Sequence, residues 1–238
     1  YFGLSSQTRS LFPNDDDMHD LQKDTAASDA DADVILASLK DNTAVFRIGE
    51  QNLSTALRLK GIYNIYNAAA ALALVLSVIG KSIDLKKLVE TLSNIEPAFG
   101  RGETLTIGGQ PLELVLVKNP SGFRLGLSSF NAEGHKTMIA INDNYADGRD
   151  MSWLWDVDFQ SLHKDGVEQI TGIRANDMAL RLQYDEVSVT DVDTNIPRAL
   201  RRFISASSDT PKRIFCTYTA MIHIRKELAK ITEVERIS

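Results

Sequence analysis

Near its middle the chain reads Leu112-Glu113-Leu114-Val115-Leu116-Val117, followed at once by Lys118-Asn119-Pro120-Ser121. A short apolar run that ends at a polar turn predicts a buried β-strand. Asn119 can cap the start of a helix, and Pro120 is tolerated in a first turn because its missing N–H would have no helical partner there. The stretch therefore predicts a strand that passes directly into a helix.

Strands and helices keep alternating on the C-terminal side of this unit. We expect strands over 137–141, 167–173, 186–189 and 213–216, and helices over 176–182, 196–204 and 218–229. Such alternation is typical of an α/β fold with a mostly parallel, doubly wound sheet. Ligands bind these sheets at the carboxyl ends of the strands, so polar residues that follow a strand are the first candidates for a site.

A break at Glu96-Pro97-Ala98-Phe99-Gly100 separates this region from the residues before it, and we place the boundary between domains 1–98 and 99–238 there. Before the break we expect strands over 44–48 and 53–59, a hairpin turn at 49–52, a helix over 64–79, and a second helix that is capped by Asp84 and runs to residue 92. Residues 4–33 are acidic and poor in large apolar side chains, which predicts a loop.

The composition narrows the function classes. The chain has 26 Lys and Arg against 32 Asp and Glu, and its net charge of −6 argues against a nucleic-acid partner. Its single cysteine, Cys216, lies in an apolar run, which excludes an internal disulfide and a cysteine-rich zinc ribbon and favours the reducing cytoplasm. No run approaches the roughly 20 apolar residues of a membrane helix, so no transmembrane segment is expected. Because Tyr1 opens the chain without a signal-peptide pattern, we expect it to start within a domain.

Three places carry candidate binding residues. Asn64 and Asn67 are three apart at the start of the helix over 64–79, where one can cap the helix and the other can bind a ligand; capping by both is the simpler alternative. Arg101 follows the domain break, and its guanidinium suits a phosphate or ribose, although a solvated arginine fits the pattern too. Asn119 opens a helix whose free N–H groups favour an anion, but a polar turn needs no ligand.

The loop over 142–156 combines aspartates, asparagines, a glycine and both tryptophans of the chain. An aromatic wall can hold a carboxylate in a fixed orientation, and a fixed carboxylate can orient a histidine. The four histidines are scattered without metal-ligand spacing and none lies in this loop, so a histidine partner must come from elsewhere. The chain also has no Walker-type phosphate loop, dinucleotide-binding glycine motif or nucleophile-elbow serine.

These places follow one another as they do in the Mur ligases, which the chain resembles. Gly61-Ile62-Tyr63-Asn64-Ile65-Tyr66-Asn67 is similar to the Gly-x-His-Asn-x-x-Asn signature that closes the central ATPase domain, with Tyr63 in place of histidine. Phe99-Gly100-Arg101-Gly102 resembles the Gly-Arg hinge into the C-terminal domain, and Lys118-Asn119-Pro120 resembles the Asn-Pro loop of that domain. The resemblance covers about residues 44–230. It is specific to the MurT branch of the family in three segments, residues 142–156, 174–182 and 217–221.

The resemblance implies a remnant of the central ATPase domain up to residue 98 and then a Rossmann-like C-terminal domain. It implies a ligase subunit that uses ATP and magnesium to form an acyl phosphate on the α-carboxyl of D-glutamate in lipid II. Ammonia released from glutamine by the Cys–His pair of a GatD-type amidotransferase partner would then displace phosphate. By the family pattern, Asn64, Asn67 and Asn119 lie near adenine and Arg101 near ribose or phosphate. Asp150 or Asp156, with Asp147 behind them, would assist the partner's histidine.

Two departures from the family pattern limit these expectations. Relatives usually carry a four-cysteine zinc ribbon that this chain lacks, so neither zinc nor another metal is expected on its own residues. The phosphate loop and most magnesium ligands would belong to an N-terminal part outside the chain, which should not hydrolyse ATP alone. We expect the protein in the cytoplasm, at the inner face of the membrane where lipid II resides. A nucleotide- and partner-binding module without chemistry, or another Mur-type amino-acid ligase, stays open as an alternative.

Overall fold

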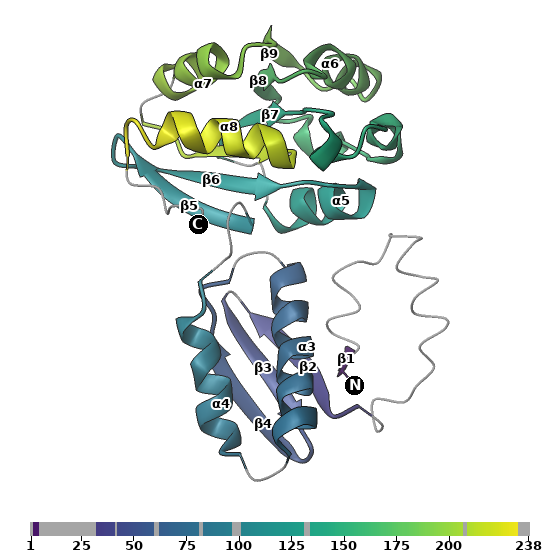
Figure 1. The fold of residues 1–238 in the computed structure, drawn as a ribbon, viewed down its shortest axis with the longest axis vertical. Helices are drawn as coiled ribbons and strands as arrows, with labels where there is room; N and C mark the ends of the chain where they lie inside the picture. The colour runs from purple at the N-terminus through teal and green to yellow at the C-terminus, as the bar shows by residue number, and fades with distance from the viewer. Residues whose placement is uncertain are drawn as a thin grey trace. The chain divides into compact units, whose positions relative to one another are not determined.

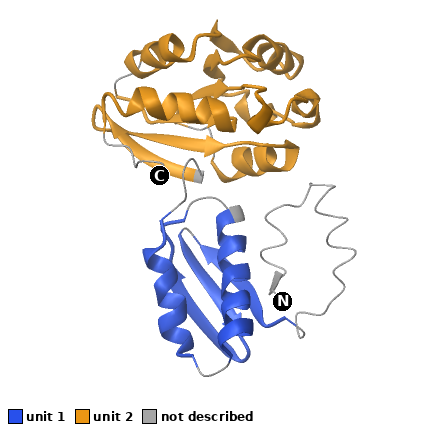
Figure 2. Cartoon of the chain, viewed as in Figure 1, with its two compact units in different colours: residues 1–97 blue, residues 98–238 orange. Residues whose placement is uncertain are grey.

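The computed structural model describes residues 2–4, 32–40, 42–59, 62–80, 83–96, 101–130, 134–206 and 209–232, the first three as backbone only. Most of the loop expected over 4–33 lies outside these residues, as does most of the break expected over 96–100. The chain forms two compact units, Tyr1–Pro97 (unit 1) and Ala98–Ser238 (unit 2), which Figure 2 shows in different colours.

Unit 1 is a four-stranded sheet with two helices on one face (Figure 1). Its strand order is β1 (Phe2–Leu4), β2 (Val34–Lys40), β3 (Thr43–Ile48) and β4 (Gln51–Ala56), with β1 parallel to β2 and the other neighbours antiparallel. Alternation along the strands buries Leu36 and Phe46 on the same face. Against this face pack α3 (Ile62–Ile79), α4 (Leu85–Thr91) and the 3₁₀ helix η2 (Leu92–Asn94).

The elements predicted for this region are confirmed, with shifts at their ends. Asp84 caps α4 as expected, because its carboxylate accepts a hydrogen bond of 3.1 Å from the Lys87 N–H. The hairpin turn is shorter than predicted and contains only Gly49 and Glu50; Gly49 has a φ of 58°, which glycine tolerates without strain. Strand β2 is not among the elements predicted from the sequence.

Unit 2 contains a six-stranded sheet in the order β5-β6-β10-β7-β8-β9. Its strands are β5 (Arg101–Ile107), β6 (Gln110–Leu116), β7 (Lys136–Ala140), β8 (Val167–Thr171), β9 (Val189–Asp193) and β10 (Lys212–Cys216). Only β5 is antiparallel to its neighbour, and the other pairs are parallel. The predicted α/β fold with a mostly parallel, doubly wound sheet is therefore confirmed.

Helices cover both faces of this sheet, as successive residues of β10 show. Ile214 and Cys216 belong to the core beneath α7 (Ile196–Ser205) and α8 (Tyr218–Leu228). Phe215 points the other way, and its ring lies 5.4 Å from that of Phe123 on α5 (Pro120–Ser129). On that face lie also α6 (Ala175–Tyr184) and the 3₁₀ helices η4 (Ser152–Asp156) and η5 (Gln160–Leu162), among which Phe159 packs 5.0 Å from Phe123. The 3₁₀ helix η3 (Tyr145–Asp147) contacts the start of α8.

The strand predicted over 186–189 is wrong in position. Glu186 adopts a left-handed φ of 57°, and the Val187 N–H still donates to the Leu182 carbonyl, so these residues end α6. The strand begins at Val189, where it pairs with Val167 of β8. The other predicted strands and helices of this region match observed elements to within a few residues.

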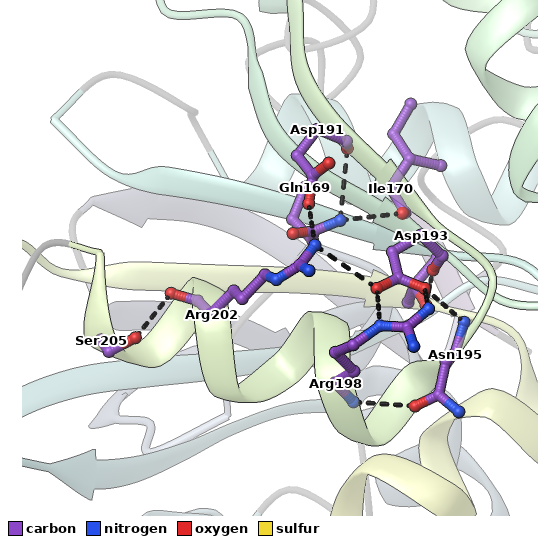
Figure 3. A network of polar contacts seen from close by, with 9 residues as sticks. Gln169, Ile170, Asp191, Asp193, Asn195, Arg198, Arg202 and Ser205 are labelled. Atoms are coloured by element: carbon purple, nitrogen blue, oxygen red, sulfur yellow. Dashed lines mark hydrogen bonds and ion pairs between the residues drawn. The ribbon is translucent and has the colours of Figure 1, made fainter.

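Polar side chains at the β9 edge bind one another, as Figure 3 shows. The Asp193 carboxylate accepts hydrogen bonds from Arg198 Nε at 2.5 Å and Nη2 at 2.7 Å, and from the Asn195 N–H at 2.9 Å. These bonds, those of Arg198 foremost, lower the pKa of Asp193 to about 2. Asn195 caps α7 through the Arg198 N–H. The cluster thus fastens α7 to the sheet.

Candidate active site at the carboxyl ends of the parallel strands

The sheet of unit 2 has its topological switch point where β10 lies between β6 and β7. β6 leads to α5 on one face, and β10 leads to α8 on the other (Figure 1). Doubly wound sheets bind ligands where neighbouring connections leave to opposite faces. The side chains that follow these three strands therefore define the candidate site: Lys118, Asn119, Asn142, Asp143, Thr217, Tyr218 and Thr219.

Asn119 caps α5, as the sequence predicts. Its side-chain oxygen accepts a hydrogen bond of 2.7 Å from the Gly122 N–H. The side-chain NH₂ of this exposed residue makes no hydrogen bond within the part of the chain that the structure describes. One half of the carboxamide is thus structural, and the other half is available to a ligand.

A cation and an aromatic ring lie beside Asn119. The ammonium of Lys118, at the end of β6, lies 5.6 Å from the ring centroid of Tyr218, the first residue of α8. This is a cation–π distance, and both side chains are exposed. An amide donor, a cation and an aromatic surface together fit the anionic and aromatic parts of a nucleotide.

Asn142 ties the ends of three strands together. Its buried carboxamide accepts a hydrogen bond from the Ile173 N–H at 3.0 Å, after β8, and donates one to Thr219 Oγ1 at 3.0 Å, after β10. Its own N–H donates to Thr217 Oγ1 at 2.9 Å. From the sequence, Asn142, Thr217 and Thr219 stand out only as members of longer motifs, although polar residues after predicted strands are the signal that points to such a network.

Asp147 holds the start of α8. Its carboxylate accepts hydrogen bonds from the Thr219 N–H at 2.7 Å, the Thr219 hydroxyl at 2.6 Å and the Asn144 N–H at 3.0 Å. A carboxylate at a helix N-terminus also interacts favourably with the helix dipole. Of the three aspartates proposed from the sequence, this one has the clearest structural task.

Removal of this cap is expected to destabilise unit 2. Asp147→Ala leaves the donors of Thr219 and Asn144 without their acceptor, and loss of a helix cap costs about 1–2 kcal/mol. Both tryptophans of the chain, Trp153 and Trp155, lie in unit 2, so their fluorescence during urea unfolding reports on this unit alone. Asp147→Asn keeps one acceptor oxygen and should lose less. An unchanged midpoint for Asp147→Ala would contradict the capping role.

Asp150 and Asp156 present their carboxylates to solvent at either end of η4. Asp150 accepts a hydrogen bond of 2.8 Å from the Ser152 N–H, and bonds from the Ser152 side chain and backbone lower the pKa of Asp150. Asp150 is therefore ionised at neutral pH. The Asp156 carboxylate has no hydrogen-bond partner among the described residues. Both groups are thus open to a partner from outside the chain.

The segment between these aspartates is fixed to α5. The ring of Trp153 packs edge-on against Phe123, with 6.4 Å between centroids. The Arg124 guanidinium donates two hydrogen bonds to the Asp156 carbonyl, at 2.6 and 3.2 Å. Trp153 therefore anchors the acidic loop to α5, and the Asp156 backbone is held in place. That an aromatic wall orients a carboxylate of this loop stays a prediction.

The remaining predicted binding residues belong to other elements, and of these Arg101 pairs with Val115 near the carboxyl end of β6. Asn64 and Asn67 belong to α3 of unit 1, where Asn64 is buried and Asn67 is exposed. Because α3 begins at Ile62, Asn67 lies beyond the first turn and does not cap the helix. Arg101 is the first residue of β5, and its side chain lies outside the described part of the chain.

Other routes to catalysis find little support. Within the described residues, no group of three or more His, Cys, Asp or Glu side chains could hold a metal ion. Cys216 is buried, and burial raises the pKa of its thiol, so it is a core residue as expected. None of the described helices is both long and apolar enough to cross a bilayer.

Comparison with known proteins identifies relatives of both the sequence and the fold. A family model described as MurT ligase C-terminal matches residues 116–221. The MurT subunit of the lipid II isoglutaminyl synthase (glutamine-hydrolyzing) of Streptococcus pneumoniae (strain ATCC BAA-255 / R6) is 32% identical over 201 residues, which cover 82% of this chain and 43% of that subunit. The subunit of the same name from Staphylococcus aureus (strain COL) is 36% identical over 137 residues, covering 56% of this chain and 31% of that one. The chain thus spans less than half the length of these relatives.

Solved structures agree on the fold. MurF from Acinetobacter baumannii superimposes with a TM-score of 0.63 at 16% identity, covering 84% of this chain and 45% of that protein. A pseudomurein peptide ligase type C from Methanothermus fervidus gives a TM-score of 0.62 at 16% identity, with coverages of 84% and 42%. Residues 116–221 are therefore a MurT ligase C-terminal domain, and the chain belongs to the MurT family of Mur ligases.

Proposed function

We propose that this chain is part of the ATP-dependent ligase subunit of a lipid II isoglutaminyl synthase. The observation that carries the proposal is its similarity to the Streptococcus pneumoniae subunit, whose name states that activity. The similar stretch of 201 residues is longer than unit 2 and so includes part of unit 1. We assign unit 1 to the C-terminal part of the central ATPase domain and unit 2 to the C-terminal domain of the ligase.

The proposed reaction activates a carboxylate and then replaces phosphate with nitrogen. The α-carboxylate of the lipid II D-glutamate attacks the γ-phosphorus of ATP, which gives an acyl phosphate and ADP. Ammonia then attacks the acyl carbon, phosphate leaves with the C–O bond electrons, and D-isoglutamine results. Since lipid II resides in the membrane, the complex would work in the cytoplasm at the inner face of that membrane.

The nucleotide is assigned to the switch point. The free NH₂ of Asn119 would donate to the adenine, and Lys118 would face the phosphates while Tyr218 offers its ring. By the resemblance, Arg101 would bind ribose or phosphate, and Asn64 and Asn67 of unit 1 would also be nucleotide-binding residues. Magnesium, when bound, would neutralise the phosphate charge; by the resemblance, most of its ligands would belong to a part of the ligase outside this chain.

The ammonia source would be a GatD-type subunit that hydrolyses glutamine with a Cys–His pair. Asp150 or Asp156 would orient the histidine of that pair, since both carboxylates face solvent on a segment that α5 holds in place. Asp147 ranks behind them because three hydrogen bonds already occupy it.

The test uses the full-length subunit together with its cognate glutamine-hydrolysing subunit. Lipid II and ATP are supplied with ammonium chloride, with glutamine, or with a series of amino acids, and the product mass and ADP release are measured. ADP release with a product that carries an amide in place of a hydroxyl supports the proposal. Joining of an amino acid would instead identify another Mur-type ligase, and nucleotide binding without ADP release would identify a binding module.

Two substitutions of Asn119 are expected to distinguish the capping role of its side-chain oxygen from the proposed ligand-binding role of its NH₂ group. Asn119→Asp keeps the oxygen that caps α5 but replaces the NH₂ donor, so the KM for ATP should rise about tenfold, equivalent to about 1.4 kcal/mol, at nearly unchanged stability. Asn119→Ala removes both the capping oxygen and the NH₂ donor, so it should raise the KM for ATP and also lower the unfolding free energy by about 1 kcal/mol. An unchanged KM for ATP in Asn119→Asp would remove this residue from the nucleotide site.

A further inference from the structure

Three large apolar side chains lie together on the surface of unit 2 and form what we call the aromatic patch: Trp155, Leu180 and Tyr184. Their exposed fractions are 47%, 48% and 70%. The rings of Trp155 and Tyr184 meet edge-on with 5.1 Å between centroids. Leu180 and Tyr184 are one turn apart on α6 and therefore share its outer face. The patch is thus one surface made from η4 and α6.

Arg181 holds this surface rigid from below. Its guanidinium carbon lies 5.5 Å from the ring centroid of Trp155 and 5.5 Å from that of Phe159. The same group donates to the Val157 carbonyl at 2.6 Å and forms an ion pair of 2.5 Å with Asp185. A tryptophan fixed in this way loses little further entropy when another surface covers it.

This combination is typical of the centre of a protein–protein interface. Trp, Tyr and Arg dominate the residues that contribute most to binding between proteins, and they act best within a polar rim. The rim is acidic, because the exposed Asp156 follows Trp155 directly in the chain and the exposed Asp158 lies three residues after it. A complementary surface would place apolar side chains over the patch and Lys or Arg opposite these carboxylates.

We propose that the aromatic patch is the main attachment point of the glutamine-hydrolysing subunit. The inference rests on the proposed function, in which a histidine of that subunit reaches Asp150 or Asp156. Asp156 follows Trp155 directly in η4, and both side chains are exposed, so a protein surface that reaches this carboxylate lies close enough to contact the tryptophan as well. Attachment and catalysis then reside in different side chains: the patch sets the affinity, and the carboxylate sets the rate of glutamine hydrolysis.

The experiment measures the affinity of the full-length ligase subunit for its cognate glutamine-hydrolysing subunit by calorimetry or interferometry. Trp155→Ala and Tyr184→Ala are each expected to raise Kd at least about tenfold. Leu180→Glu adds a charge to the patch without removing a ring, so it should have the same effect even if Trp155→Ala disturbs η4. Ile231→Ala is the matched control, since Ile231 is 60% exposed beyond the end of α8.

Two further measurements distinguish failure of this inference from failure of the proposed function. All patch variants should keep wild-type ammonia-driven amidation, and glutamine-driven amidation should recover at saturating partner. Wild-type Kd values for all three variants would overturn the inference while leaving the ligase activity in place. If the variants instead abolish self-association of the ligase subunit, seen by sedimentation, a second copy is the occupant and the inference is wrong. Absence of ammonia-driven amidation in the wild type would refute the proposed function itself.

Discussion

Glutamine-driven amidation is expected to fall by about 10²–10⁴-fold when the carboxylate that orients the partner's histidine becomes an amide. Either Asp150→Asn or Asp156→Asn should show this loss in the full-length complex. Asparagine has nearly the same shape as aspartate, but its NH₂ group offers a donor where the histidine N–H needs an acceptor, so the imidazole is held in the wrong tautomer. The rates of glutamine hydrolysis and of lipid II amidation are measured at saturating partner subunit.

Ammonia-driven amidation provides the internal control for this prediction. Added ammonia bypasses the glutaminase, so both variants should amidate lipid II at near wild-type rates when ammonium chloride replaces glutamine. Asp165→Asn is the matched variant, because Asp165 is an exposed aspartate of the same connection between β7 and β8. If glutamine hydrolysis stays at the wild-type level in both Asp150→Asn and Asp156→Asn, the idea that the chain lends a carboxylate to its partner is wrong.

Local patterns predict the position of most strands, but they miss the edge strand β5. Leu105 is the only large apolar side chain of β5 that is buried within its described residues, so its alternation is weak. The turn that follows carries the stronger signal. Gly108 and Gly109 both have positive φ, 57° and 81°, and a pair of glycines between two short runs is typical of a two-residue hairpin turn. Attention to this pair would have located β5.

The contacts of the candidate site depend on strand order, which one sequence does not reveal. Asp147 caps α8 through Thr219, a residue 72 positions away, and this contact exists only because β10 lies beside β7. The sequence predicts that polar residues gather at strand ends. It does not tell a carboxylate that caps a helix from one that faces a partner, because both are aspartates of the same acidic loop.

The largest effect on stability is expected from the buried ion pair between β6 and β10. Arg213 Nε and Nη2 both donate to Glu113, at 2.9 and 2.6 Å, and Nη1 donates to the Phe130 carbonyl at 2.8 Å. The two side chains are only 4% and 10% exposed. Arg213→Met should therefore lower the unfolding free energy of unit 2 by about 3–5 kcal/mol, because the Glu113 charge stays buried but loses its ion pair with Arg213. Urea unfolding followed by tryptophan fluorescence measures this change.

Replacing both partners distinguishes the stabilisation that the ion pair provides from the cost of burying the Glu113 charge after the ion pair is lost. The double variant Glu113→Leu/Arg213→Met removes both charges of this pair, so its loss of stability should be smaller than that of Arg213→Met alone. Lys136→Met is the matched control: Lys136 pairs with Glu168 at 2.9 Å, but it is 41% exposed, and a surface pair contributes at most about 1 kcal/mol. If Arg213→Met lowers the unfolding free energy no more than Lys136→Met does, the buried Glu113 carboxylate does not need Arg213 to compensate its charge. If the double variant is the least stable of all, the pair stabilises the sheet by more than charge compensation, through the register that it fixes between β6 and β10.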